Sequence, residues 1–359
     1  YGPARLHLDD AIALAGSLAD ERLEWRARVV RAQVAFQTGE PVAARVGQEA
    51  IAVFERLDDD TGLAVAWTWM ALAAGAAGDP HETEAATKAL EYARAAGDKR
   101  LEVRALQTLA GRLVFGPLHS SEALSEAERL LELAAGDLRA AADVRAILSF
   151  LVAMRGDFEG ARGMAAEARR ALEELGLPAD AAFARALAAA FIELVAARFA
   201  VAETELRAGY AVLDRLGEDP FTSSIAGNLA EVLALQDKDD EAERYAVTAS
   251  EKSSDDDYDA QIRWRRAKAL VLVHRGNLAE AEALVRGAVD IATGTDDINM
   301  LGDCFARLAD VLAAAGRPKE AKVALEDALA RYERKGNLVA AEKVGRSLTD
   351  IAGSRPGGA

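Results

Sequence analysis

The sequence predicts an all-α solenoid, a superhelix of about eight helical hairpins of about 40 residues each. Three observations support this prediction. Glycine or a polar residue interrupts the chain at nearly regular intervals, and the apolar residues follow a helical rather than an alternating pattern. Apolar residues make up 51% of the chain but aromatic residues only 6%, so Ala and Leu, both strong helix formers, dominate. Each hairpin would leave an apolar face that only a stacked copy can cover.

The hairpin pattern is clearest over residues 308–328. Small residues such as Ala309 and Ala321 stand where two helices must approach closely, and Leu325 and its apolar neighbours fill the gaps between them. Gly316 ends the first helix, because glycine interrupts a helix and adopts turn conformations readily. We expect Ala309 and Ala321 to be buried contact points within the pair.

The turns repeat at intervals of roughly 40 residues along the whole chain. Turns inside the hairpins are predicted at Gly39, Gly78, Gly116, Gly156, Ala197, Asp237, Gly276 and Gly316. Turns between hairpins are predicted at Asp58, Gly97, Gly136, Gly176, Gly217, Ser254, Gly294 and Gly336.

The first elements follow this punctuation. Residues 9–18 resemble the second helix of a pair whose first helix is missing, and helices are predicted at 21–37 and 41–57. The acidic turn at 58–61 provides caps for a helix that runs to Ala77. From there each interval of about 20 residues leaves a helix of roughly 16–18 residues, about 25 Å long.

The two ends of the chain differ in character. Residues 337–351 form an amphipathic segment that we expect to cap the array, so that the solenoid spans residues 1–352. Residues 353–359 have nothing to bury and are predicted to be disordered. Because Tyr1 opens abruptly inside a helix-like pattern, we expect the solenoid to be a fragment of a longer protein.

Charge and cysteine content limit the partners. A net charge of −16 argues against direct binding to nucleic acid or to an anionic membrane, and solvated outer helix faces explain it better than an acidic groove. No apolar run approaches the roughly 18–20 residues of a membrane span. The single cysteine, Cys304, fits a reducing compartment, so a cytoplasmic location is expected.

No motif in the sequence indicates an enzyme. A phosphate-binding Gly-x-x-x-x-Gly-Lys-Ser/Thr loop and a Gly-x-Ser-x-Gly elbow are both missing. His81 has no second histidine four residues later, as a zinc helix would require, and the four histidines are scattered. We therefore predict no catalytic residue, no cofactor and no metal site.

The repeated unit resembles the tetratricopeptide repeat (TPR). The matching positions run from Leu308 to Ala328, and the same order of residues recurs at 148–168 and 229–249. The spacing departs from the pattern around 80–85 and 117–123, and a period of about 40 rather than 34 implies longer helices. The resemblance implies a superhelix of hairpins whose first helices line the concave surface.

A narrower resemblance covers residues 213–343. The segments 215–221, 275–282 and 332–337 are similar to the C-terminal repeat region of bacterial multidomain regulators. Those proteins join a class III adenylate/guanylate cyclase domain and an AAA-type ATPase to such repeats, and similar regions end large ATP-dependent LuxR-type activators. The resemblance implies a sensory or interaction region of a larger signalling or transcriptional regulator.

The same analogy selects candidate residues on the concave surface. Arg263, Arg266 and His274 fall within an arc of about 80° on one helix, so we expect them to share one exposed face. They form either a small patch for an acidic group or a solvated face that balances the acidic residues at 255–259. Inner positions are Gln33, Leu72, Ala110, Phe150, Ala190, Glu231, Leu270 and Asp310; of these, Leu270, Glu231 and Asp310 join the three basic residues as partner-binding candidates.

The sequence thus favours a non-catalytic module that binds a protein or peptide along its concave surface. Two alternatives remain open: a small-molecule sensor enclosed by the superhelix, and a self-assembly scaffold. A closed apolar chamber would favour a small molecule, and an open charged groove would favour a peptide.

Overall fold

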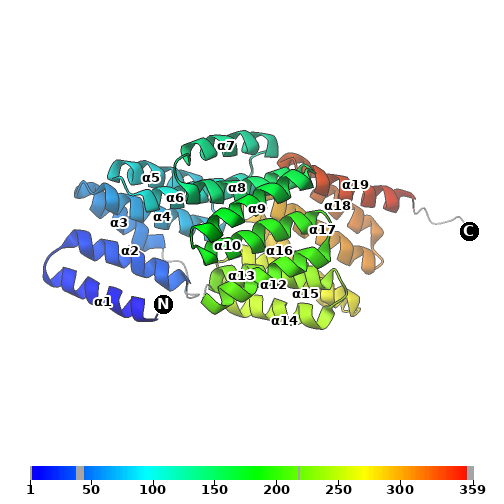
Figure 1. Cartoon of the computed structure of the whole chain (residues 1–359). Coiled ribbons are helices and arrows are strands. Elements are labelled where there is room, and N and C mark those ends of the chain that lie inside the picture. The colour runs from blue at the N-terminus through cyan, green and yellow to red at the C-terminus, as the bar shows by residue number, and fades with distance from the viewer. Residues whose placement is uncertain (1, 38–43, 217–218, 354–359) are drawn as a thin grey trace, which may run out of the picture.

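The computed structural model describes residues 2–37, 44–216 and 219–353, which form helices and contain no β-strand (Figure 1). The predicted all-α fold is confirmed. The helices are α1 (Gly2–Ser17), α2 (Glu21–Gln37), α3 (Ala44–Arg56), α4 (Asp60–Ala77), α5 (Glu82–Ala96), α6 (Lys99–Phe115), α7 (Ser120–Leu133), α8 (Leu138–Met154), α9 (Phe158–Glu174), α10 (Pro178–Ala184), the π-helical turn η1 (Arg185–Ala189), α11 (Ala190–Val195), α12 (Phe199–Leu216), α13 (Asp219–Ala234), α14 (Asp239–Lys252), α15 (Tyr258–His274), α16 (Leu278–Thr293), α17 (Ile298–Ala314), α18 (Pro318–Lys335) and α19 (Leu338–Gly353).

The helices pair as the turn spacing predicts. The hairpins begin with α2–α3 and end with α17–α18, and α10, η1 and α11 together form the first helix of the pair completed by α12. Helices α1 and α19 flank the array. The helices predicted at 21–37 and 337–351 match α2 and α19 closely, whereas the helix predicted at 41–57 is described only from Ala44. Apart from Gly353, the predicted disordered tail lies outside the described residues, as do the turns at Gly39 and Gly217.

Most of the predicted turns adopt a left-handed backbone, even at several positions where the residue is not glycine. Asp58, Ala197 and Asp237 have φ values of 52°, 57° and 57°. This conformation costs a non-glycine residue roughly 1–2 kcal/mol, so the helix packing on both sides fixes the turn. Gly116 differs, with φ −89° and ψ −179°, because the α6–α7 connection is extended, and Gly294 has a right-handed backbone with φ −76°.

Alanine contacts hold each hairpin together. Ala309 and Ala321 are 2% and 0% exposed, which agrees with their predicted place between α17 and α18. Equivalent alanines are buried in α9, α14 and α16. The small side chains let paired helices approach closely, and the larger Leu and Val residues fill the core around them.

Successive turns of the superhelix lie directly on one another. Inner helices touch across long sequence distances in a regular series: α2 with α13, α4 with α15, α6 with α17, and α8 with α19. In each case the partner is the inner helix five hairpins later. The superhelix therefore completes a turn in five hairpins, and the next turn covers part of its inner surface. The concave side is a closed interior rather than an open groove.

Substitution of Ala321 by Leu tests the packing inside a hairpin. Because Ala321 is fully buried, the added atoms should overpack the contact between α17 and α18 and lower the unfolding free energy by about 1–3 kcal/mol. The midpoint of thermal unfolding, followed by circular dichroism, measures the effect. Val323→Leu on the exposed side of α18 is the control and should leave the midpoint unchanged. An unchanged midpoint for Ala321→Leu would show that this register is wrong.

Candidate functional site

The closed interior contains one chamber at which six successive inner helices converge. Its volume is about 70 Å³, room for a few water molecules or one small chemical group. Helices α6, α8 and the α10–α11 segment supply an apolar wall, whereas α13, α15 and the start of α17 supply a polar wall. The chamber is thus amphipathic, with two chemically different walls facing each other.

Three phenylalanines, one from each successive inner helix, build the apolar wall. The ring centroids of Phe115 and Phe150 are 6.1 Å apart in an edge-to-face arrangement, and those of Phe150 and Phe191 are 4.7 Å apart. Such aromatic pairs add about 0.5–1.5 kcal/mol beyond the area that they bury. The stack joins α6, α8 and α11 into one rigid surface.

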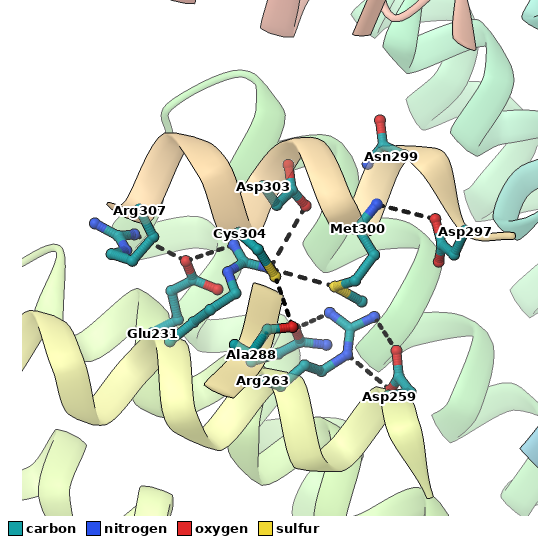
Figure 2. Close-up of polar contacts among 12 residues, drawn as sticks. Glu231, Asp259, Arg263, Ala288, Asp297, Asn299, Met300, Asp303, Cys304 and Arg307 are labelled. Atoms are coloured by element: carbon teal, nitrogen blue, oxygen red, sulfur yellow. Dashed lines mark hydrogen bonds and ion pairs between the residues drawn. The ribbon is translucent and has the colours of Figure 1, made fainter. Parts of the chain in front are cut away.

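A buried ion-pair network around Glu231 lies in and beside the polar wall. Arg266 and Arg307 both donate to the same oxygen of Glu231, at 2.8 and 2.9 Å. Figure 2 shows Arg307 of α17 reaching Glu231 of α13, so the network joins hairpins that are not neighbours in sequence. Glu231 is only 4% exposed, and removal of either partner would leave a buried charge without full compensation.

Arg263 and Asp303 of the polar wall are also paired. Arg263 donates through Nε to Asp259 at 2.8 Å (Figure 2). It also donates through Nη1 to the side-chain oxygen of Asn228 at 2.6 Å. Asp303 lies 3.5 Å from Arg266 and accepts a hydrogen bond from the hydroxyl of Tyr332 at 2.6 Å. Positive and negative groups balance, so the wall has no net charge and orients a bound group through hydrogen bonds instead.

The environment of each carboxyl sets its ionisation. Burial raises the pKa of Glu231, but Arg266 and Arg307 outweigh it and bring the pKa down to about 2. Burial without a close cation has the opposite result at Asp297, whose pKa rises to about 7. Asp297 also accepts a hydrogen bond from the backbone N–H of Met300 at 2.9 Å and so caps α17 (Figure 2). Burial also raises the pKa of the Cys304 thiol to about 12, which makes this thiol a poor nucleophile.

A buried lysine holds the chamber closed. The Lys335 ammonium is 0% exposed and donates to the carbonyl oxygens of Leu113 and Gly116, at 2.9 and 2.6 Å. One residue further on, the carbonyl of Gly336 accepts a hydrogen bond from the Ser120 hydroxyl at 2.9 Å. We call these contacts between Lys335–Gly336 and residues 113–120 the clasp.

Two further contacts strengthen the clasp. Arg112 of α6 forms an ion pair with Asp296, and its Nε lies 3.4 Å from Glu82. A Cβ atom at Gly336, whose φ is +74°, would lie 2.5 Å from the His119 ring, so only glycine fits this close approach. The clasp therefore brings the ends of α6 and α18 together next to Val114 and Phe115, which line the chamber.

The structure brings together only some of the predicted site residues. Glu231, Arg263 and Arg266 line the chamber, as do the predicted inner residues Phe150 and Ala190. The predicted exposed basic face is wrong, because Arg266 is 7% exposed and paired with Glu231. A helical projection gives the direction of Arg266 but not that Glu231 of α13 and Asp303 of α17, in the two neighbouring hairpins, enclose it.

The other candidates lie outside the chamber. His274 is partly exposed and contacts Asp239 at the start of α14, at 2.8 Å. Leu270 is buried in the apolar core, and Asp310 is an exposed partner of Arg307, at 2.8 Å. A role of these residues in partner binding stays a prediction.

Several chamber residues escaped the sequence prediction. Phe115, Phe191, Asn228 and Asp303 line the chamber, and none was a candidate. One signal was present in a chain that is poor in aromatics: Phe115, Phe150 and Phe191 recur at about one repeat length, near the ends of first helices. The polar residues carried no signal that distinguishes them from ordinary surface residues.

Neither a metal site nor a membrane-spanning helix is found in the described residues. Across residues 2–37, 44–216 and 219–353, no group of three or more His, Cys, Asp or Glu side chains is arranged to hold a metal ion. No helix in the same residues is long and apolar enough to cross a membrane.

Comparison with known proteins agrees with the geometry. A tetratricopeptide repeat family model matches residues 260–334, which cover all of α16 and α17 and most of α15 and α18. No curated protein matches the chain. A crystal structure of a Rap protein complexed with competence and sporulation factor is similar over 94% of this chain and 98% of that chain, with 15% identity and a TM-score of 0.52.

Two other solved structures are similar at lower scores. Yeast Tom70 matches 94% of this chain and 68% of its own, with 15% identity and a TM-score of 0.48. BtubC from P. vanneervenii matches 67% of this chain and 92% of its own, with 19% identity and a TM-score of 0.41. The family match and the likeness to the Rap protein show a TPR-like superhelix; at such identity the likeness concerns the fold alone.

Substitution of Asp297 by Asn tests the buried carboxyl. A pKa raised from 3.8 to about 7 means that the folded state holds the proton more tightly than the unfolded state. Its contribution is complete below about pH 4 and is lost as the pH rises through 7. Asn keeps the cap of α17 but cannot ionise, so the fall in thermal midpoint between pH 4 and 7 should become shallower. Asp98→Asn, at the more accessible cap of α6, should not change the slope. Equal slopes in wild type and Asp297→Asn would contradict this assignment.

Proposed function

We propose that this chain is a non-catalytic binding module that holds a short peptide segment in its central chamber. The observation that supports this most directly is the pairing of walls: three stacked phenylalanines face a wall of arginine, asparagine and aspartate side chains. An apolar side chain of a peptide fits the phenylalanine wall. Its amide groups fit the polar wall, where Asn228 and Asn299 offer hydrogen-bonding groups.

Because the chamber is small, binding of a peptide requires the superhelix to change its shape. About 70 Å³ accommodates one side chain but not a peptide strand, so a bound peptide requires the two turns of the superhelix to separate near the clasp. A ligand that prefers the open form shifts the population toward it. This change in curvature is the signal that the module passes to the rest of a larger protein.

The regulatory setting is part of the proposal. The resemblance of residues 213–343 to the repeat regions of bacterial multidomain regulators supports a sensory role within such a protein, in the cytoplasm. The structurally similar Rap protein is complexed with competence and sporulation factor, which gives a precedent for a ligand on this fold.

A small-molecule sensor is the second candidate. The closed interior and the small volume of the chamber favour a compact ligand with an apolar part and a hydrogen-bonding part. The self-assembly scaffold stays a prediction, which light scattering on the purified chain tests.

Selection from a displayed random peptide library tests the proposal. Peptides enriched on the wild-type chain should bind Phe191→Ala at least about tenfold more weakly, because the apolar wall loses one ring. Phe199→Ala is the matched control, since Phe199, the first residue of α12, is also partly buried but packs on the core rather than in the chamber. Equal affinities for wild type and Phe191→Ala would contradict peptide binding in the chamber. If no peptide is enriched, but a compound from a small-molecule library binds the wild type and not Phe191→Ala, the small-molecule sensor is favoured.

A further inference from the structure

A second concave surface lies outside the chamber, between α6 and α7. We propose that this groove binds a basic amphipathic helix of another protein along about two helical turns. The groove is separate from the chamber, and the inference does not depend on the proposed peptide ligand.

The groove exists because α7 stands away from its hairpin partner. Helix α7 packs much less closely on α6 than α5 packs on α4, and Figure 1 shows α7 at the edge of the molecule, above α6 and α8. The connection from Gly116 to His119 is extended, and the first buried alanine of α7, Ala123, comes seven residues after Gly116 rather than the five that separate Gly156 from Ala161. The clasp contact of Ser120 fixes the start of α7 in this position.

The floor of the groove is apolar and large enough for side chains of a partner. Its volume is about 530 Å³, within the range of about 300–1,000 Å³ that is usual for binding pockets. Leu109 and Leu113 of α6, Leu118 of the connection and Leu130 of α7 form the apolar surface. The α7 side runs from Glu122 to Leu130, about 12 Å along the helix axis or about two turns. This length suits the apolar stripe of a short helix.

The charges that remain available around the groove are mostly negative. Helix α7 carries Glu122, Glu126, Glu128 and Glu132 against one basic residue, Arg129. In the described part of the chain Glu122 makes no ion pair, and Glu126 has only an exposed pair with Arg129, which contributes little. The α7 edge of the groove therefore complements Lys or Arg on the partner helix.

The edge of the groove opposite α7 determines the orientation in which the partner helix binds. Arg112 lies there but is occupied by Asp296 and Glu82. Arg334 of α18 is exposed and forms no ion pair with any described residue. The fitting helix has an apolar stripe, basic residues on the edge that faces α7, and an acidic residue on the edge that faces Arg334. Because α18 also carries Lys335, such a helix contacts both turns of the superhelix beside the clasp.

Fluorescence polarisation with a labelled model helix tests the proposal on the full chain. The probe is a peptide of Leu and Lys in heptad order, and its counterpart has Glu in place of Lys. The wild-type chain should bind the Lys peptide and not the Glu peptide. Thr83→Trp, which fills the groove from an exposed position on α5, and Glu122→Lys should each weaken binding at least about tenfold.

Two control variants separate the groove from general attraction to an acidic chain. Thr87→Trp lies one turn further along α5, and Glu128→Lys lies on α7, and neither residue lines the groove. Both should bind the Lys peptide like the wild type, and circular dichroism should show that all four variants fold. Unchanged binding in Thr83→Trp, or an equal loss in Glu122→Lys and Glu128→Lys, would overturn the proposal. A loss in Phe191→Ala would also overturn it, because it would place the peptide in the chamber.

Discussion

The structure depends on one buried lysine. Lys335 has no carboxylate partner among the described residues, and its ammonium instead donates to two backbone carbonyls at the end of α6, more than 200 positions earlier in the chain. Burial lowers the pKa of this lysine to about 8, so it stays mostly protonated at neutral pH. A solenoid whose repeats contact only their neighbours has no such tie between its turns. Here the tie brings α18 onto α6, closes the chamber and positions the start of α7 beside the outer groove.

The contact between successive turns of the superhelix also explains why charged side chains are buried in its interior. When inner helices five hairpins apart meet, the charged residues of a concave surface lose access to water. Glu231, Arg266 and Arg307 are tolerated there because each has a partner, and removal of one would cost more than the pair contributes. The phenylalanines of α6, α8 and α11 then face this network across a narrow space. The same contact therefore creates a chamber inside and, through the extended α6–α7 connection, a groove outside.

The sequence predicts the features that depend on residues within one repeat, but it does not predict the contacts between different repeats. Turn positions, helix bounds and the alanines between paired helices follow from patterns within about 40 residues, and Asp237 lies in a turn at the predicted position. The exposed patch at Arg266 fails because acidic residues of the neighbouring helices α13 and α17 enclose this side chain, which the pattern of α15 alone does not show. Lys335, one residue before Gly336, resembles an ordinary lysine at a helix C-terminus. The irregular spacing at 117–123 was a visible sign of the groove, although a sequence does not show what such a slip produces.

A distance measurement across the clasp tests this account most directly. Spin labels at Ser121→Cys and Glu333→Cys report the separation of α7 and α18, and the buried Cys304 should not react. We predict a single narrow distance distribution for the wild-type background. Lys335→Met should lengthen and broaden it, because the two carbonyls lose their donor, whereas Lys319→Met at an exposed position of the same helix should not. An unchanged distribution in Lys335→Met would contradict the claim that this lysine closes the superhelix.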